Sequence, residues 1–306
     1  MVPKLCTTVQ YLFIGAIGYI FAGAPLSRSL FGARKQDPPK EISFEKSASL
    51  VISEDNLTCP HHAYNVHIFS RDPLVIYIQS FLSNEEAEHL VRVRYETLLI
   101  LSTSNMPIVI NPLNPNNRSE DKFRPSTVWT EGVERLDTTV RESEKALLDR
   151  DDIVKCIENR ARAFQGWRPD VFIEKLWSQR YKQNGHYRHH YDWSSASSHS
   201  GRISSFMVYL EANCTGGGTN FPRLEIPRGG NWCEFVECES RQGVTFRPLK
   251  GNAIFWENFR ADGTGYKECW HAGLPVLSGT KIGLNIWSWY QKGYQPSTPC
   301  TDILRP

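Results

Sequence analysis

The pattern of apolar and polar positions divides the chain into a helical first part and a strand-rich second part. Residues 74–78 form an apolar run of strand length. Ser83 is a suitable N-cap for the next helix because two glutamates follow it in the first turn, and we expect this helix to continue to about Arg94. We expect a second helical stretch with breaks over about 138–164. The Pro- and Asn-rich segment 105–117 between them is typical of a loop.

From residue 172 onward the pattern changes to short β runs separated by turns. The expected strands cover residues 173–181, 204–210, 244–248, 253–256 and 282–290. Turn signals fall between them at 184–185, 216–218, 229–230 and 251–252. Helices first and many strands afterwards predict an α+β domain with a double-stranded β-helix (jelly-roll) core and supporting N-terminal helices.

An uncharged, largely apolar stretch from Leu5 to Ser27 precedes these elements. It is long enough to span a thin bilayer, although its glycines weaken the signal. The alternative is a cleaved signal peptide with Ala22-Gly-Ala24 as the small-residue site. Because Pro25 directly after that site would hinder cleavage, an uncleaved signal anchor is favoured. Either way, we expect an N-terminal membrane anchor or signal segment before the folded domain.

The expected domain boundaries follow from this reading. Residues 1–27 form the anchor or signal peptide. Residues 28–70 are charged, include Pro38-Pro39 and hold little that could form a core, so they are expected to be a stalk or linker. Residues 71–306 are then the main folded domain.

Charge and cysteine content narrow the compartment and partners. A net charge of +2 without a basic stripe argues against nucleic acid as a partner. Three sequons, at Asn56, Asn117 and Asn213, favour glycosylation and hence a lumenal domain. Of 8 cysteines, seven lie beyond the apolar stretch, where disulfides fit a secretory compartment but leave at least one thiol unpaired. We therefore expect a membrane-anchored protein of the endoplasmic reticulum or secretory pathway, or alternatively a secreted one.

The flanking charges oppose that orientation. Arg28, Arg34 and Lys35 follow the apolar stretch, and only Lys4 precedes it. On the positive-inside rule this arrangement favours a cytoplasmic C-terminal part.

His190-x-Asp192 is the feature with the clearest chemistry. On a strand, residues two apart point to one face, so both side chains can hold one metal ion. His189 would face the other way. Two imidazoles and one carboxylate, completed by His271, can cap one face of Fe(II) and leave the other face open for a chelating cosubstrate and O2. Lys281 adds the fixed positive charge that a dicarboxylate cosubstrate requires.

The surrounding residues resemble prolyl 4-hydroxylases. The run His-Ala-Gly-Leu-Pro-Val from His271, followed by Lys281, resembles the third-ligand motif of that family. Residues 187–192, 202–210, 217–222 and 250–256 resemble its first-ligand strand, its central hairpin and the strand before the third ligand. The resemblance begins near Pro73 and extends to Trp287. It implies an Fe(II)- and 2-oxoglutarate-dependent dioxygenase, with L-ascorbate as an expected reductant.

The resemblance also implies roles for individual residues. His190, Asp192 and His271 would hold iron, and Lys281 would pair with the distal carboxylate of 2-oxoglutarate. Tyr181 and Thr219 fall where the family places hydroxyls near the cosubstrate. At two further positions, Trp287 matches a pocket wall and Arg202 matches an arginine near the peptide substrate, which makes Arg202 a candidate catalytic residue.

Departures from the family pattern concern the substrate. Peptidyl-proline hydroxylases commonly end this region Trp-x-His, where this chain has Trp287-Ser-Trp289, and Leu274 replaces a common cysteine. A proline-containing peptide or protein is the first expectation for the substrate. The same chemistry on a free amino acid, a cyclic peptide or a secondary metabolite is the alternative, with desaturation or cyclisation as other outcomes.

Two hypotheses from other classes remain open at this point. A catalytically silent jelly-roll binding module would be expected to have lost a ligand or the lysine, and all four are present. A zinc hydrolase could use two histidines and one carboxylate, but needs a general base such as the glutamate of His-Glu-x-x-His, which the sequence lacks.

Overall fold

The computed structural model describes residues 42–51, 57–92, 95–96, 120–130, 133–193, 200–240 and 242–294. The Leu5–Ser27 stretch, Asn56, Asn117 and the 105–117 segment lie outside these residues. Among the described residues, the helices are too short or too polar to cross a membrane.

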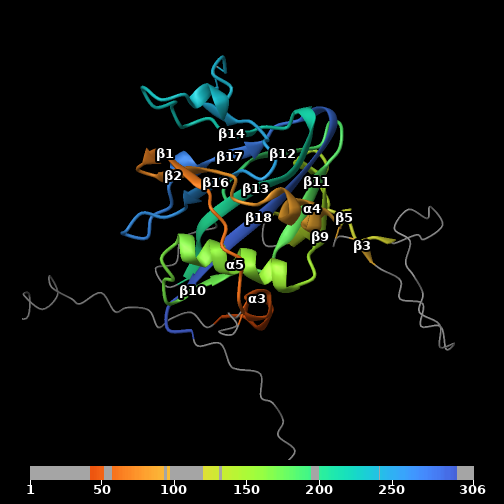
Figure 1. The fold of residues 1–306 in the computed structure, drawn as a ribbon, viewed down its shortest axis with the longest axis vertical. Coiled ribbons are helices and arrows are strands. Elements are labelled where there is room, and N and C mark those ends of the chain that lie inside the picture. The colour runs from red at the N-terminus through yellow and green to blue at the C-terminus, as the bar shows by residue number, and fades with distance from the viewer. Residues whose placement is uncertain are drawn as a thin grey trace, which may run out of the picture. The chain divides into compact units, whose positions relative to one another are not determined.

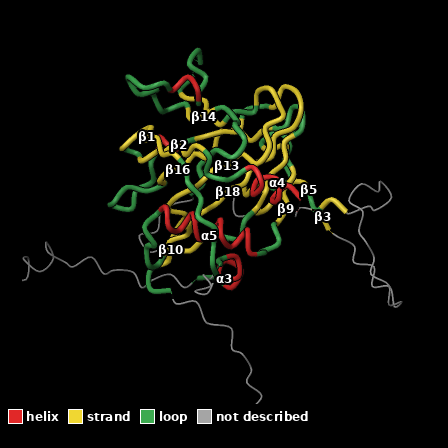
Figure 2. The backbone as a smooth tube through the Cα atoms, in the orientation of Figure 1, coloured by secondary structure: helices red, strands yellow, loops and turns green. Residues whose placement is uncertain are grey.

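Three α-helices accompany a predominantly β fold in this part of the chain (Figure 2). The helices are α3 (Phe44–Ser49), α4 (Asn84–Arg92) and α5 (Asp152–Phe164), with 3-10 turns η1 (Trp232–Glu234) and η2 (Lys267–Cys269). The early strands are β1 (Asn65–Arg71), β2 (Leu74–Gln79), β3 (Tyr95–Glu96), β4 (Glu120–Asp121), β5 (Arg124–Pro125), β6 (Val128–Thr130), β7 (Val133–Arg135), β8 (Arg141–Glu142) and β9 (Glu144–Leu147). The later strands are β10 (Val171–Ile173), β11 (Trp177–Tyr181), β12 (His186–His190), β13 (Ser200–Gly216), β14 (Thr219–Phe221), β15 (Val244–Phe246), β16 (Ala253–Glu257), β17 (His271–Gly273) and β18 (Val276–Gln291).

Two antiparallel sheets make the core. The larger has the order β1-β2-β16-β13-β18-β11-β9-β5, with β10 also pairing with β18, and the smaller has the order β15-β14-β17-β12-β8. Strands distant in sequence are therefore neighbours, as in a jelly roll. This arrangement agrees with the predicted jelly-roll core, and the strands expected after residue 172 are present.

The apolar core has two parts. Aromatic side chains that include Tyr77, Phe221 and Trp256 fill the space between strands of the two sheets. The other part lies where α5 crosses the larger sheet (Figure 1), because Ile157 and Ala161 of this helix belong to one cluster with Ile286 of β18. The long strands β13 and β18 are paired along most of their lengths and lie in the middle of the larger sheet.

The start of helix α4 confirms that Ser83 is its N-cap. Glu86 N–H donates to Ser83 Oγ at 3.1 Å, and Ser83 N–H donates to a carboxylate oxygen of Glu86 at 2.9 Å. This reciprocal pair is a capping box.

The helix expected over 138–164 is only half correct. Helix α5 begins after Asp151, whose side chain accepts from Val154 N–H at 2.9 Å. The preceding residues form β8 and β9, because β9 pairs with β11 and β8 pairs with β12. Hydrogen bonding to these strands overrides the helical preference of the segment.

The expected linker over 28–70 is too long. Val51 is buried in the core and its N–H donates to Ile173 O at 2.8 Å. A disulfide joins Cys59 to Cys156 of α5, and β1 pairs with β2. Residues 42–51 and 57–70 thus belong to the folded unit, since buried packing, a disulfide and strand pairing fasten them to it.

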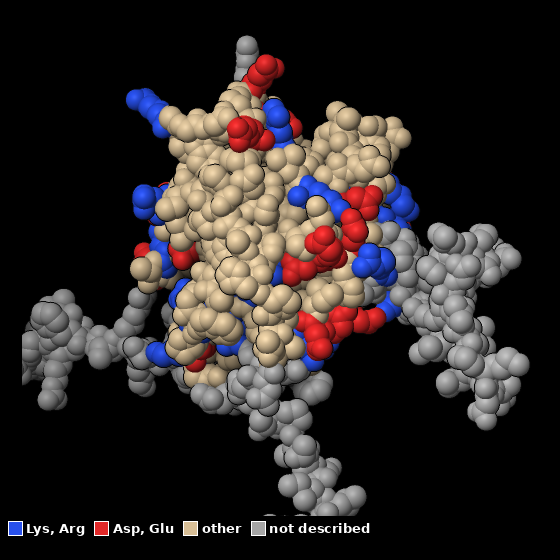
Figure 3. Space-filling model, viewed as in Figure 1, with Lys and Arg blue, Asp and Glu red and all other residues tan. Residues whose placement is uncertain are grey.

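The remaining described cysteines include a second disulfide, Cys233–Cys238, and free thiols at Cys214 and Cys269. The face shown in Figure 3 is largely uncharged in its middle, and Lys, Arg, Asp and Glu side chains lie around this area.

Candidate active site

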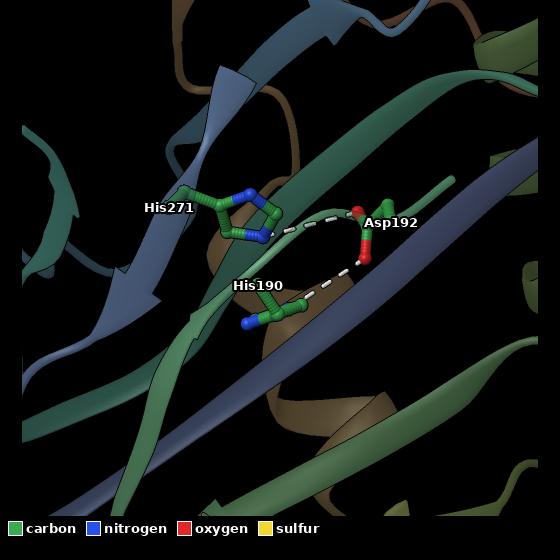
Figure 4. A group of neighbouring side chains, drawn as sticks. All are labelled: His190, Asp192 and His271. Carbon is green, nitrogen blue, oxygen red and sulfur yellow. Dashed lines mark ion pairs between the residues drawn. The ribbon is translucent and has the colours of Figure 1, made fainter. Parts of the chain in front are cut away.

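Three side chains from two neighbouring strands converge on one point (Figure 4). His190 ends β12, Asp192 follows it, and His271 begins β17 directly opposite His190 in the strand register. The Nε2 atoms of His190 and His271 lie 3.8 Å and 4.0 Å from the two carboxylate oxygens of Asp192. One donor atom from each residue lies within 4.8 Å of the others, so a single metal ion can contact all three.

Both imidazoles are held with Nε2 toward the centre. His190 Nδ1 donates to Arg188 O at 2.8 Å, and His271 Nδ1 donates to Cys269 O at 2.9 Å. A proton on Nδ1 leaves the Nε2 lone pair free to bind a metal, which is the usual outer-shell arrangement for metal-binding histidines. Burial lowers the pKa of His190, and the neighbouring His271 lowers it further, so the neutral form suited to metal binding predominates.

His189 faces away from this centre, as predicted from strand alternation. Its Nε2 lies 2.9 Å from Asn220 Oδ1, and its ring is parallel to that of Trp270. The structure thus brings together the three expected ligands and separates the competing histidine from them.

Lys281 lies in the same pocket as the three candidate ligands. This pocket is lined by Tyr181, Tyr187, His190, Asp192, Met207, Thr219, Trp256, His271, Gly273, Lys281 and Asn285. Lys281 is 1 % exposed, and its Nζ donates to Gly217 O at 2.5 Å. Among the described residues it has no carboxylate partner within ion-pair distance. A buried cation without a counter-charge is costly, so the pocket favours an anionic ligand.

The two hydroxyl residues expected near the cosubstrate line this pocket. The ring of Tyr181 lies under the Lys281 ammonium, with Nζ 4.6 Å from its centroid. Thr219 is buried and its Oγ1 is hydrogen-bonded to Tyr209 OH at 2.8 Å. Burial lowers the pKa of Lys281 to about 8.

Arg202 and Trp287 lie together farther along β13 and β18. The Arg202 guanidinium stacks on the Trp287 ring at 3.9 Å and forms a two-pronged ion pair with Glu174, at 2.6 Å and 3.0 Å. Glu174 also pairs with Lys46 of α3 at 2.7 Å, and Lys46 lies 3.9 Å above the Trp289 ring. The two tryptophans and the three charged residues thus form one continuous stack, which we call the Trp287–Trp289 cluster.

Sequence reasoning missed several of these residues. Tyr187, Met207 and Asn285 line the pocket, and Tyr187 stacks on His190 with 3.6 Å between ring centroids. Strand alternation could have placed Asn285 there, because it lies four residues after Lys281 on β18. Nothing in the sequence pairs Lys46 with Glu174, which are distant in the chain.

Comparisons with known proteins agree with this geometry. Residues 176–289 match the family described as the 2OG-Fe(II) oxygenase superfamily. The chain is similar to prolyl 4-hydroxylase subunit alpha-2 of Caenorhabditis elegans, with 24 % identity over 87 % of this chain and 43 % of that protein. It is also similar to prolyl 4-hydroxylase 5 of Arabidopsis thaliana, with 27 % identity over 72 % of this chain and 70 % of that protein.

Among solved structures, the viral collagen prolyl hydroxylase of Paramecium Bursaria Chlorella virus-1 aligns with a TM-score of 0.48 and 24 % identity, covering 71 % of this chain and 96 % of that chain. The chain spans less than half of the nematode subunit.

The sequence comparisons and the site agree that this chain is similar to the prolyl 4-hydroxylases within the 2OG-Fe(II) oxygenase superfamily, which is the resemblance predicted from the motifs. The three candidate ligands and Lys281 are the residue types that Fe(II) and 2-oxoglutarate require, and all four are present and face one pocket.

Proposed function

We propose that this chain is an Fe(II)- and 2-oxoglutarate-dependent dioxygenase that hydroxylates proline in a peptide or protein. The observation that carries the proposal is the pocket that combines two Nε2-directed histidines, one carboxylate and the unpaired buried cation of Lys281. The prolyl 4-hydroxylases among its relatives favour proline as the substrate residue.

The side chains in the pocket have the chemistry that Fe(II) and 2-oxoglutarate require, and their ligand atoms point toward one centre. His190, Asp192 and His271 would hold Fe(II), and Lys281 would pair with the distal carboxylate of 2-oxoglutarate beside Tyr181 and Thr219. When bound, iron with 2-oxoglutarate and O2 supplies an oxidant, such that one oxygen atom ends in succinate, the other ends in the substrate hydroxyl, and CO2 is released. The chain's own contribution is to fix the ligands and shield the reaction from water.

Arg202 and Trp287 would form the substrate side of the site. The Nε and Nη2 groups of Arg202 are used by Glu174, and its Nη1 group is the donor left to reach a substrate carbonyl oxygen. Trp289 stands where peptidyl-proline hydroxylases commonly carry histidine, and here its ring is covered by Lys46. Because this departure alters the substrate side, hydroxylation, desaturation or cyclisation of a free amino acid, cyclic peptide or secondary metabolite is the second candidate.

We also propose a lumenal setting for the domain in the endoplasmic reticulum. The apolar stretch 5–27 would anchor the chain in the membrane, and L-ascorbate would keep the iron reduced. The Cys59–Cys156 and Cys233–Cys238 disulfides suit an oxidising compartment. Asn213 is exposed on β13, so its side chain can be reached for glycosylation. Glycosylation of Asn56 and Asn117 is proposed from their sequons alone. Resistance of the purified protein to a glycosidase that removes N-linked glycans would contradict this setting.

The proposed activity is tested by mass spectrometry after incubation with Fe(II), 2-oxoglutarate, ascorbate and proline-containing peptides. We expect a peptide to gain the mass of one oxygen while succinate forms, and we expect His190→Ala and Asp192→Ala to abolish both. Succinate formation coupled to a metabolite but to no proline peptide would overturn the substrate and leave the enzyme class intact. Equal succinate formation by the wild type and both variants would overturn the metal assignment.

A further inference from the structure

The strand that carries His190 contains a β-bulge directly before this residue. Tyr187 of β12 pairs with Gly273 of β17 and His190 pairs with His271, so three steps along β12 match two steps along β17. A bulge adds one residue to one strand and changes the direction of the side chains that follow. Tyr187 and His190 therefore face the same side, where their rings are stacked.

This bulge decides which of two adjacent histidines faces the candidate metal centre. In a regular antiparallel ladder, two further steps from the Tyr187 pair would bring His189 opposite His271. The residue two positions after His189 is a tyrosine, so the carboxylate of Asp192 would be lost from that face. A change of register by one residue thus exchanges the two faces of the strand, and the bulge is what turns His190 inward.

His189 is held on the outer face of the smaller sheet, away from the metal centre, by a bond to Asn220 of β14. The Nδ2 group of Asn220 donates to Gln242 O at 2.9 Å and to Val244 O at 3.3 Å. Because these carbonyl oxygens can only accept, Asn220 turns Oδ1 toward His189 Nε2, which lies 2.9 Å away and carries the proton. A protonated Nε2 has no lone pair for a metal ion, so the same bond removes His189 from competition for the metal.

The bond crosses β17, which lies between β14 and β12. Two strand spacings amount to about 10 Å, and the side chains can meet over β17 because the residue paired with Asn220 is the small Ala272. Ala272 follows His271 directly, and Trp270, which precedes His271, has its ring parallel to that of His189. The neighbours of both candidate histidine ligands are thus joined on the outer face.

We propose that His189 and Asn220 are positioning residues that hold the bulged register of β12, so that His190 and Asp192 face the metal centre. The inference rests on the proposed metal site and deepens it. Backbone pairing alone does not hold this register, because the bulge interrupts the ladder with β17. The side-chain bond between β12 and β14 supplies the missing attachment at this point.

Strand β12 offers a matched control and a rescue for the test. The imidazole of His186 bonds to Asn184 O at 3.0 Å and not to Asn220. His186→Ala therefore removes an imidazole from the same strand and leaves the bond across β17 intact. His189→Gln retains an N–H donor at a similar distance from the backbone and should keep the register. His190→Ala removes a candidate ligand and is the reference for loss of the site.

The experiment is a titration of the full chain with Mn(II), followed by electron paramagnetic resonance, without substrate or cosubstrate. Each variant is titrated below the onset of its unfolding, determined by circular dichroism, so that the affinity is that of the folded protein. We expect His189→Ala to weaken Mn(II) binding by about 3- to 10-fold, the effect of one hydrogen bond. His186→Ala and His189→Gln should stay close to the wild type. The double variant His189→Ala with Asn220→Ala should bind no more weakly than Asn220→Ala alone, because both changes remove the same bond.

Equal Mn(II) affinity in His189→Ala and His186→Ala would overturn the proposal, as would a further loss in the double variant. If Asn220→Ala does not fold, the two His189 variants decide alone, and equally weak binding by both would overturn the role of the bond. Unchanged binding by His190→Ala would instead overturn the metal site on which the proposal rests. Because no turnover is measured, each of these results is distinct from failure to hydroxylate proline peptides.

Discussion

Lys281 is the single residue on which cosubstrate binding is expected to depend most. It is buried, donates only to the Gly217 carbonyl oxygen among the described residues, and faces the same pocket as the candidate ligands. We expect Lys281→Met to weaken 2-oxoglutarate binding by about 2–5 kcal/mol, the usual cost of removing one partner of a buried ion pair. Isothermal titration of the Mn(II)-loaded protein with 2-oxoglutarate measures this loss.

The lowered pKa of Lys281 gives this expectation a pH signature. Burial lowers the pKa to about 8, so the free protein loses the ammonium charge as the pH rises through that value. Only the charged form pairs with a carboxylate, and 2-oxoglutarate affinity should therefore fall above about pH 8. Lys281→Arg keeps its charge at every accessible pH and should abolish this slope. Lys182→Met, at an exposed position, is the control that should leave both affinity and slope unchanged.

The candidate metal ligands His190 and Asp192 could be predicted from the sequence because strand alternation places residues two apart on one face. The placement of Arg202 and Ser205 on one side of the sheet could not be predicted, because alternation assigns residues three apart to opposite faces and a β-bulge at Ile203 reverses this. The role of Lys46 could not be predicted either, because its ion pair with Glu174 depends on the packing of a segment whose sequence resembles a linker.

At the scale of elements, helix α4 is attached to α5 through one carboxylate. Glu86 closes the capping box with Ser83 and also receives two bonds from Arg160 of α5, at 2.6 Å and 2.8 Å. Glu86→Ala should lower the free energy of unfolding by about 1–3 kcal/mol, because it leaves Arg160 largely buried and unpaired. Chemical denaturation measures this loss. The control is Glu88→Ala on the same helix, which removes an exposed ion pair with Lys250 and should lower the free energy of unfolding by less than about 1 kcal/mol.

The contribution of Glu86 should also disappear in acid. Burial acts to raise its pKa, but the bonds from Arg160 and Ser83 outweigh burial, so the pKa lies below its ordinary value of 4.5. A carboxylate with a lowered pKa stabilises the fold above its ordinary pKa and loses that contribution as the pH falls through the lowered value. Wild type and Glu86→Ala should therefore converge in stability as the pH falls below 4.5 and through the lowered pKa. A constant difference down to the acid transition would contradict this role.

Elements were predicted well where one chemical signal dominates. The strands after residue 172 are apolar or alternating and become the jelly-roll core. The prediction for the segment before α5 was wrong, because β9 is largely polar and becomes a strand by pairing with β11 and β5. The same holds for α3 and the residues around it, which are recruited into the fold by Val51 and by the covalent bond at Cys59.

At the scale of the whole domain, the two disulfides should contribute very differently to stability. Cys59–Cys156 joins positions 97 residues apart and fastens the segment before β1 to α5. Cys233–Cys238 joins positions only 5 residues apart and so closes a short loop. If loop closure in the unfolded chain dominates, the expected contributions are about 4.7 kcal/mol for the long loop and about 2 kcal/mol for the short one. We expect Cys59→Ser with Cys156→Ser to lower the melting temperature clearly more than Cys233→Ser with Cys238→Ser. Calorimetry of both double variants checks this, and an equal or reversed order would mean that native-state contacts of the loops, and not chain entropy, set the contribution of each bond.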